Sequence, residues 1–75
     1  MRQKNTTARP TRKQQEVLQL LANDYKIPEI AVELGATYRA IEKRIERCKI
    51  KLGKRTAAGL VAYAIVKGFI QLLSK

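Results

Sequence analysis

Basic and acidic side chains are distributed unevenly between residues 39 and 55. This stretch holds eight Lys or Arg residues and only two acids, Glu42 and Glu46, which lie one helical turn apart. Phosphate groups repel a glutamate, yet its carboxylate can accept a hydrogen bond from the amino group of cytosine in the major groove of DNA. The pattern therefore suggests that the glutamates read cytosines while the surrounding basic residues contact phosphates.

Ion pairing is a second explanation of the two glutamates. On a helix, Glu42 can pair with Arg39 because residues three apart are neighbours on the helix surface. Glu46 can likewise pair with Lys43 or Lys49. Each such pair contributes only about 0.2–0.5 kcal/mol to helix stability. The two explanations are compatible, since a paired glutamate can position a basic side chain that itself contacts DNA.

These charged residues are expected to lie on a helix over about residues 37–51. Its apolar positions recur at helical spacing and form a stripe for burial, made of Ile41, Ile45, Cys48 and Leu52. The start of this helix and its polar positions supply the candidate DNA-binding residues, which are Thr37, Tyr38, Arg39, Glu42, Lys43, Arg44, Glu46, Arg47 and Lys51. Arg44 and Lys51 flank the stripe, which favours phosphates as their partners. Thr37 is a helix cap, a phosphate ligand, or both.

Four short helices joined by tight turns are predicted, which makes the chain all-α. Three threonines are placed to cap helix starts: Thr11, Thr37 and Thr56. Three glycines are placed to end helices in the left-handed conformation: Gly35, Gly53 and Gly68. Outside the third helix the expected core residues are Val17, Leu18, Leu20, Leu21, Ile30, Ala31, Leu34, Ala57, Val61, Ala64 and Ile65. The fold class is therefore a four-helix bundle.

The second and third helices have the spacing of a helix-turn-helix at the centre of the bundle. Ala31 is small enough to let the next helix approach closely, and Gly35 makes the turn at positive φ without a steric penalty. Ile41 anchors the third helix to the second. Many helical hairpins share this spacing, but the localised positive charge favours a third helix that lies in the major groove.

The fourth helix carries small and apolar residues on the side opposite its expected core residues. These residues are Gly59, Ala62, Tyr63 and Val66. Because a monomer is expected to be polar there, the pattern predicts a homodimer interface. The alternative is that the tail after Gly68 folds over this side.

The domain boundary is expected near Pro10. Residues 1–10 are polar and aperiodic and are predicted to form a flexible basic arm, and residues 11–75 form the DNA-binding domain. The basic residues of the arm and the first helix start are Arg2, Lys4, Arg9, Arg12 and Lys13. They serve either to follow phosphates or the minor groove, or only to keep the chain soluble.

Composition excludes several classes of function. The net charge of +10 favours a polyanionic partner. The chain has no His and a single Cys, and no spacing of carboxylates or glycines is typical of a catalytic or phosphate-binding site, so we expect no enzyme, metal or cofactor. No signal peptide or apolar run long enough to span a membrane is found, which predicts a cytoplasmic protein with no membrane partner.

From Thr11 to Ile70 the sequence resembles the DNA-binding domain of the LuxR/FixJ/GerE family of bacterial transcription regulators. The matching motifs are "TRKQQEVLQLLA", "EIAVELGAT", "KLG" and "VAYAIVKGFI". The length of the whole chain is close to that of stand-alone, GerE-like members. The resemblance implies a four-helix domain with its third helix in the major groove and a fourth helix that often forms the dimer contact.

The sequence departs from this family at several positions. Glu42 replaces the lysine that commonly contacts DNA, so the target sequence of the family is not carried over. Lys54 replaces a usual apolar residue, and Lys26 replaces a usual capping serine. The run "EKRIERCKIKL" also resembles the promoter-reading helix of sigma factor region 4, although residues 53–68 fit that family poorly.

The sequence thus predicts a transcription regulator that binds double-stranded DNA sequence-specifically as a homodimer. The alternative is a small adaptor or sigma-region-4-like factor that acts through RNA polymerase or another regulator. Salt separates the two, because direct DNA binding weakens steeply as salt rises through counterion release.

Overall fold

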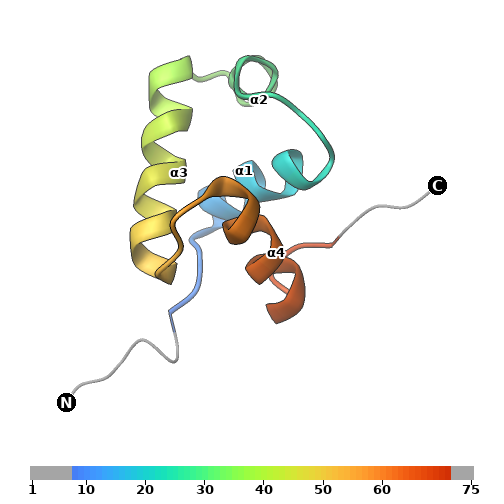
Figure 1. The fold of residues 1–75 in the computed structure, drawn as a ribbon. Coiled ribbons are helices and arrows are strands. Elements are labelled where there is room, and N and C mark those ends of the chain that lie inside the picture. The colour runs from blue at the N-terminus through green and yellow to red at the C-terminus, as the bar shows by residue number, and fades with distance from the viewer. Residues whose placement is uncertain (1–7, 72–75) are drawn as a thin grey trace.

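A computed structural model describes residues 8–71 of the chain. It contains four helices, which are α1 (Arg12–Ala22), α2 (Ile27–Leu34), α3 (Tyr38–Leu52) and α4 (Ala57–Lys67). Figure 1 shows α3 along one side of the molecule and α2 across one end of it, and α1 and α4 pack against the inner side of α3. No strand occurs between residues 8 and 71, so the predicted all-α fold with a central helix-turn-helix is confirmed.

The helix starts follow from local hydrogen bonds that the sequence encodes. The Thr11 hydroxyl accepts from the Gln14 N–H at 3.1 Å, and the Gln14 amide oxygen accepts from the Thr11 N–H at 2.9 Å, which together make a capping box. The hydroxyl of Thr37 caps α3 and that of Thr56 caps α4. At α2, where the cap residue is Lys26, the Glu29 carboxylate accepts the Lys26 N–H at 2.7 Å instead.

All four helices end with a residue in the left-handed conformation. Each end is closed by a backbone hydrogen bond from an N–H group to the carbonyl five residues earlier. The left-handed residue is a glycine after α2, α3 and α4, at φ +64°, +70° and +81°, as predicted. After α1 it is Asp24, at φ +72°, because Asp tolerates this conformation better than most residues with a side chain. The closing N–H groups belong to Tyr25, Ala36, Lys54 and Phe69. This arrangement is the Schellman motif, which satisfies the last helix carbonyls.

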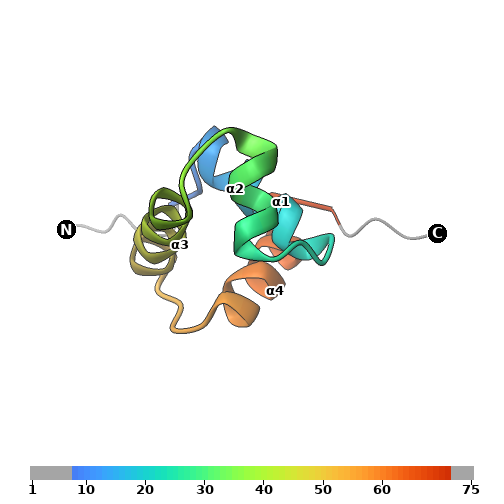
Figure 2. The same ribbon diagram turned by 90° about the horizontal axis from the view of Figure 1, so that it is seen from above.

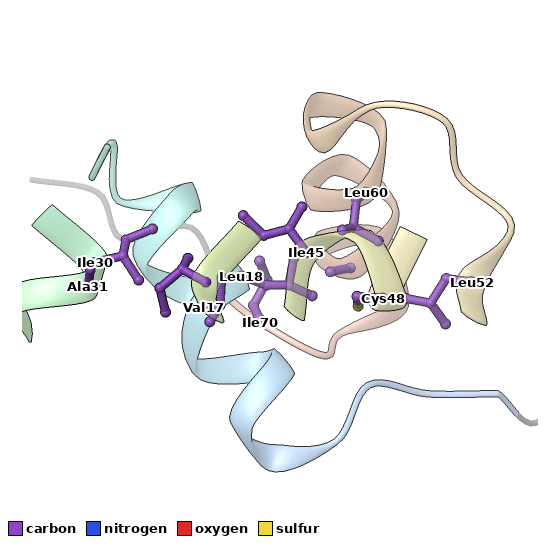
Figure 3. Close-up of a cluster of buried hydrophobic side chains, with 11 residues drawn as sticks. Val17, Leu18, Ile30, Ala31, Ile45, Cys48, Leu52, Leu60 and Ile70 are labelled. Atoms are coloured by element: carbon purple, nitrogen blue, oxygen red, sulfur yellow. The ribbon is translucent and has the colours of Figure 1, made fainter. Parts of the chain in front are cut away.

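The core lies where the four helices and the C-terminal tail meet (Figure 3). The predicted stripe of α3 is confirmed, since Ile41, Ile45, Cys48 and Leu52 are all buried. They meet Val17 and Leu18 from α1, Ile30 and Ala31 from α2, Leu60 and Ala64 from α4, and Ile70 from the tail. Leu20, Leu21 and Leu34 are half-buried at the edge of this core.

The buried face of α4 differs from the prediction at one important position. Leu60, which was not among the expected core residues, is fully buried together with Ala64. Ala57, Val61 and Ile65 are only half-buried. Because α4 is apolar on every side, hydrophobic periodicity does not fix its rotation, and the packing of α1 and α3 against it does.

Both ends of the described chain pack against the helices. Ala8 contacts the core and Pro10 is buried, so these residues of the predicted arm lie on the domain. The Gln15 side-chain amide donates to the Phe69 carbonyl at 2.7 Å, which holds the tail on α1. Residues 1–7 of the predicted arm and the last residues of the predicted tail lie outside the described part. None of the helices within residues 8–71 is both long and apolar enough to span a membrane.

Candidate nucleic-acid interface

The candidate DNA-binding residues lie together on α3. In Figure 1 and Figure 2 this helix lies on the side of the molecule opposite the α1–α2 turn, with no other helix in front of it. Eight of the nine candidates are exposed, namely Thr37, Tyr38, Arg39, Glu42, Lys43, Glu46, Arg47 and Lys51, and Arg44 is half-buried. The structure therefore brings the predicted residues onto one accessible surface.

These side chains point in different directions around the α3 axis. At 100° per residue, Arg39, Lys43 and Arg47 point away from the buried stripe. Glu42 is turned to one side of this direction, about 90° from the middle of the stripe, and Arg44 is turned to the other side. A ligand that approaches α3 from outside therefore meets basic groups first and Glu42 along one edge.

The two glutamates have different surroundings. Glu46 forms an ion pair with Lys49, with 2.8 Å between Oε2 and Nζ, so the pairing explanation holds for this residue. Among residues 8–71, no basic side chain lies within ion-pair distance of Glu42. Its carboxylate is exposed and keeps its hydrogen-bonding capacity for a ligand.

A groove of about 520 Å³ runs beside the Glu42 edge of α3. Its polar wall belongs to α3 and consists of Arg39, Glu42, Lys43, Glu46 and Lys49. Its apolar wall consists of Leu21, Ile27, Ile45 and Ala57, from all four helices. The glutamates thus face a concave, partly apolar surface and not only open solvent.

The N-terminal end of α3 is suited to an anion. The Thr37 hydroxyl oxygen accepts the Ala40 N–H at 3.0 Å, which confirms its role as a cap. Its hydroxyl hydrogen remains able to donate to a phosphate, and the first N–H groups of the helix carry the positive end of its dipole. Capping and phosphate binding by Thr37 are therefore compatible.

One residue on this side of α3 was not among the DNA-binding residues predicted from the sequence. Ile50 is 77% exposed although it is apolar, and it lies seven residues after Lys43 on the same side of α3. The methyl group of thymine is the apolar feature that DNA offers in the major groove. The sequence signal for Ile50 is an apolar residue in a position that the helical pattern makes polar.

Cys48 belongs to the core and not to the interface. It is buried on α3, and burial raises the pKa of its thiol, although the nearby Lys51 charge acts in the opposite direction. Burial thus favours the protonated thiol, the form that is not the nucleophile. Within residues 8–71, no three Cys, Asp or Glu side chains are grouped closely enough to hold a metal ion.

The candidate dimer residues of α4 are not equivalent. Ala62 and Val66 are exposed, whereas Gly59 and Tyr63 are half-buried. The Tyr63 ring meets the Phe69 ring edge-on, with 6.4 Å between their centroids, so the tail covers this part of α4. The exposed stripe is instead Ala58, Ala62 and Val66, and an apolar groove of about 380 Å³ beside it is lined by Leu21, Ala57, Ala58, Val61, Ala62 and Ile65.

Comparison with known proteins places this arrangement in a known fold. No protein-family model matches the sequence, and no curated protein matches it significantly. The solved structure of the transcription factor GerE matches this chain with a TM-score of 0.81 and 24% sequence identity. The match covers 84% of this chain and 94% of the GerE chain. The protein therefore has the helix-turn-helix fold of GerE.

Proposed function

We propose that this protein is a sequence-specific DNA-binding regulator of transcription, without enzymatic activity, that acts in the cytoplasm. The observation that carries the proposal is the exposed, mainly basic outer face of α3 on a helix-turn-helix domain. GerE, which shares the fold, is a transcription factor. A helix placed in this way enters the major groove with its N-terminal residues toward the base edges.

The residues of α3 take different parts in this proposal. Arg39, Glu42 and Lys43 lie in the first half of the helix and contact base edges. Arg47 lies one turn further on the same outward face. Thr37 contacts a phosphate at the helix start, and Tyr38 lies next to it. The flanking residues Arg44 and Lys51 contact phosphates on the side of α3 away from Glu42.

The proposal is tested by selecting from a random duplex library with the purified protein at about physiological salt. The expected result is an enriched inverted repeat with C·G pairs at fixed positions, because Glu42 accepts from the cytosine amino group. Binding to the enriched sequence should weaken steeply as salt rises. Salt-sensitive binding without an enriched motif would contradict the sequence-specific part of the proposal.

We further infer that the protein binds DNA as a homodimer through α4. The exposed stripe of Ala58, Ala62 and Val66 is apolar and continuous with the groove beside it. Alanines permit the close approach of a second α4 across a two-fold axis. Of the residues first predicted for this interface, Ala62 and Val66 lie at its centre, and Gly59 and Tyr63 lie toward its edge.

Ala62→Arg is expected to abolish the dimer without unfolding the domain, because the Ala62 side chain is exposed. Sedimentation should then report a monomer, and cooperative binding to the full inverted repeat should be lost while half-site binding remains. Val32→Arg is the matched control, since it adds the same charge at an apolar residue that is 83% exposed on α2. A variant that keeps the dimer and full-site cooperativity would exclude this α4 contact.

A second candidate function is an adaptor that contacts RNA polymerase or another regulator. The observation that favours it is a shallow pocket with a volume of about 650 Å³ at the α1–α2 turn, on the side away from α3. It combines the exposed apolar residues Tyr25 and Val32 with the acids Asp24, Glu29 and Glu33. An adaptor of this kind would show little salt-dependent binding to free DNA, in contrast to the leading proposal.

A further inference from the structure

Three cations lie over a pair of aromatic rings outside the surface discussed so far. The Lys54 Nζ is 4.4 Å from the centroid of the Tyr63 ring, and the Lys67 Nζ is 5.7 Å from the same centroid. The Arg9 guanidinium carbon is 5.4 Å from the centroid of Phe69. Because the two rings contact each other edge-on, the five side chains form one continuous cluster, which we call the aromatic–basic platform.

The platform positions its charges without neutralising them. Within the described part of the chain, none of its three cations forms an ion pair with an acid. A ring attracts a cation through its quadrupole and carries no net charge of its own. The rings therefore bring the three cations close to one another without cancelling their charge.

Lys54 is fixed in this place by the end of α3. Its backbone N–H donates to the Lys49 carbonyl at 2.8 Å, in the Schellman motif made by Gly53. A hydrophobic contact frequently accompanies this position of the motif. Lys54 is half-buried at this position, and its ammonium group reaches the Tyr63 ring.

The position of the platform relative to α3 indicates its partner. The 15 residues of α3 span about 22 Å at 1.5 Å per residue, whereas the major groove is about 12 Å wide. Because the N-terminal residues of α3 face the base edges in the proposed function, its C-terminal end is the end nearer the phosphates that border the groove. Lys54 follows this end directly, and the C-terminal ends of α3 and α4 lie at the same end of the molecule in Figure 1.

We propose that the aromatic–basic platform is a second DNA contact, which binds backbone phosphates beyond the major groove that α3 enters. This inference rests on the proposed function of α3 and adds a separate set of residues to it. The platform also changes the role of Tyr63, which holds two cations in the DNA contact and does not lie at the centre of the dimer interface. Two copies that met through this face would bring like charges together.

The test is the salt dependence of binding to the duplex that library selection provides. The double variant Lys54→Met/Lys67→Met removes two positive charges and keeps two long apolar side chains. The slope of log K against log salt should fall in magnitude by about 1.8, because each phosphate contact contributes about 0.9 to it. The base preference should not change, since phosphate contacts carry no sequence information.

Three further variants distinguish the effect of lost charge from the effect of a disturbed structure. Lys54→Arg/Lys67→Arg should keep the wild-type slope, because charge and stacking are retained. Lys67→Met alone, at an exposed position, should reduce the slope by about 0.9 and guards against misfolding of the double variant. Lys26→Met removes a charge at the α1–α2 turn, away from α3, and should leave the slope unchanged.

Two results would overturn the inference in distinguishable ways. A wild-type slope in both Met variants, together with intact sequence-specific binding, would exclude the platform as a contact and leave the role of α3 standing. Absence of salt-dependent DNA binding by the wild-type protein would overturn the proposed function and the platform together.

Discussion

Truncation of Leu60 to alanine is expected to lower the free energy of unfolding by about 2–5 kcal/mol. Leu60 is fully buried and comes from the helix that closes the bundle against α1 and α3. The lost side chain leaves a cavity that rigid neighbouring helices fill only in part. Because small domains are typically stable by only about 5–15 kcal/mol, this loss is a large share of the total stability and should lower the unfolding midpoint clearly.

Chemical denaturation monitored by circular dichroism measures this effect, and α4 itself offers the control. Val66→Ala removes apolar carbons from a residue that is 82% exposed, so its effect on the monomer should stay within about 0.5 kcal/mol. The measurement is made at a protein concentration low enough to keep the protein monomeric. Similar effects of the two substitutions would show that α4 is rotated from the described orientation.

The sequence predicted the fold best where the signal was local. Threonine caps and glycine ends depend on a few neighbouring residues, and the structure has both where they were expected. The buried stripe of α3 was also predictable, because Ile41, Ile45 and Cys48 alternate with charged residues that cannot be buried unpaired. A strong difference in polarity between the two sides of a helix determines which side is buried.

The rotation of α4 could not be predicted for the opposite reason. Its residues Leu60, Val61, Ile65 and Val66 are all apolar, so several rotations bury a similar apolar area. The choice among them depends on the shapes of α1 and α3 and on the tail that follows Gly68. The contact between Lys54 and Tyr63 depends on that choice, and sequence spacing gives no indication of it.

The sequence predicted which residues make up the site, but it predicted only some of the contacts between them. The sequence identified which α3 residues are charged and exposed, but it allowed Glu46 to pair with Lys43 or with Lys49. The structure selects Lys49, on the groove side of the helix. Exposed side chains have similar energies in several rotamers, so spacing alone does not distinguish such pairs.

Substitution of Glu42 is expected to change which base the protein prefers at one position of its site. The carboxylate lies along the edge of the outward face of α3 and has no ion-pair partner among residues 8–71. If it accepts from a cytosine amino group, Glu42→Ala should reduce discrimination at that position by about 1–3 kcal/mol, or roughly 5–150-fold. Competition binding with duplexes that differ at single positions measures this change.

Three further variants test whether the change in base preference is specific to the Glu42 carboxylate. Glu42→Gln keeps the shape of the side chain and replaces the carboxylate with an amide, which pairs with adenine, so the preference should move from cytosine toward adenine. Glu46→Ala should have the smaller effect, since the Glu46 carboxylate already binds Lys49. Glu33→Ala, at an exposed residue of α2, removes the same charge and should leave the preference intact. If Glu42→Ala instead tightens binding to every duplex equally, the carboxylate only repels phosphates, and Arg39 and Lys43 must carry the sequence readout.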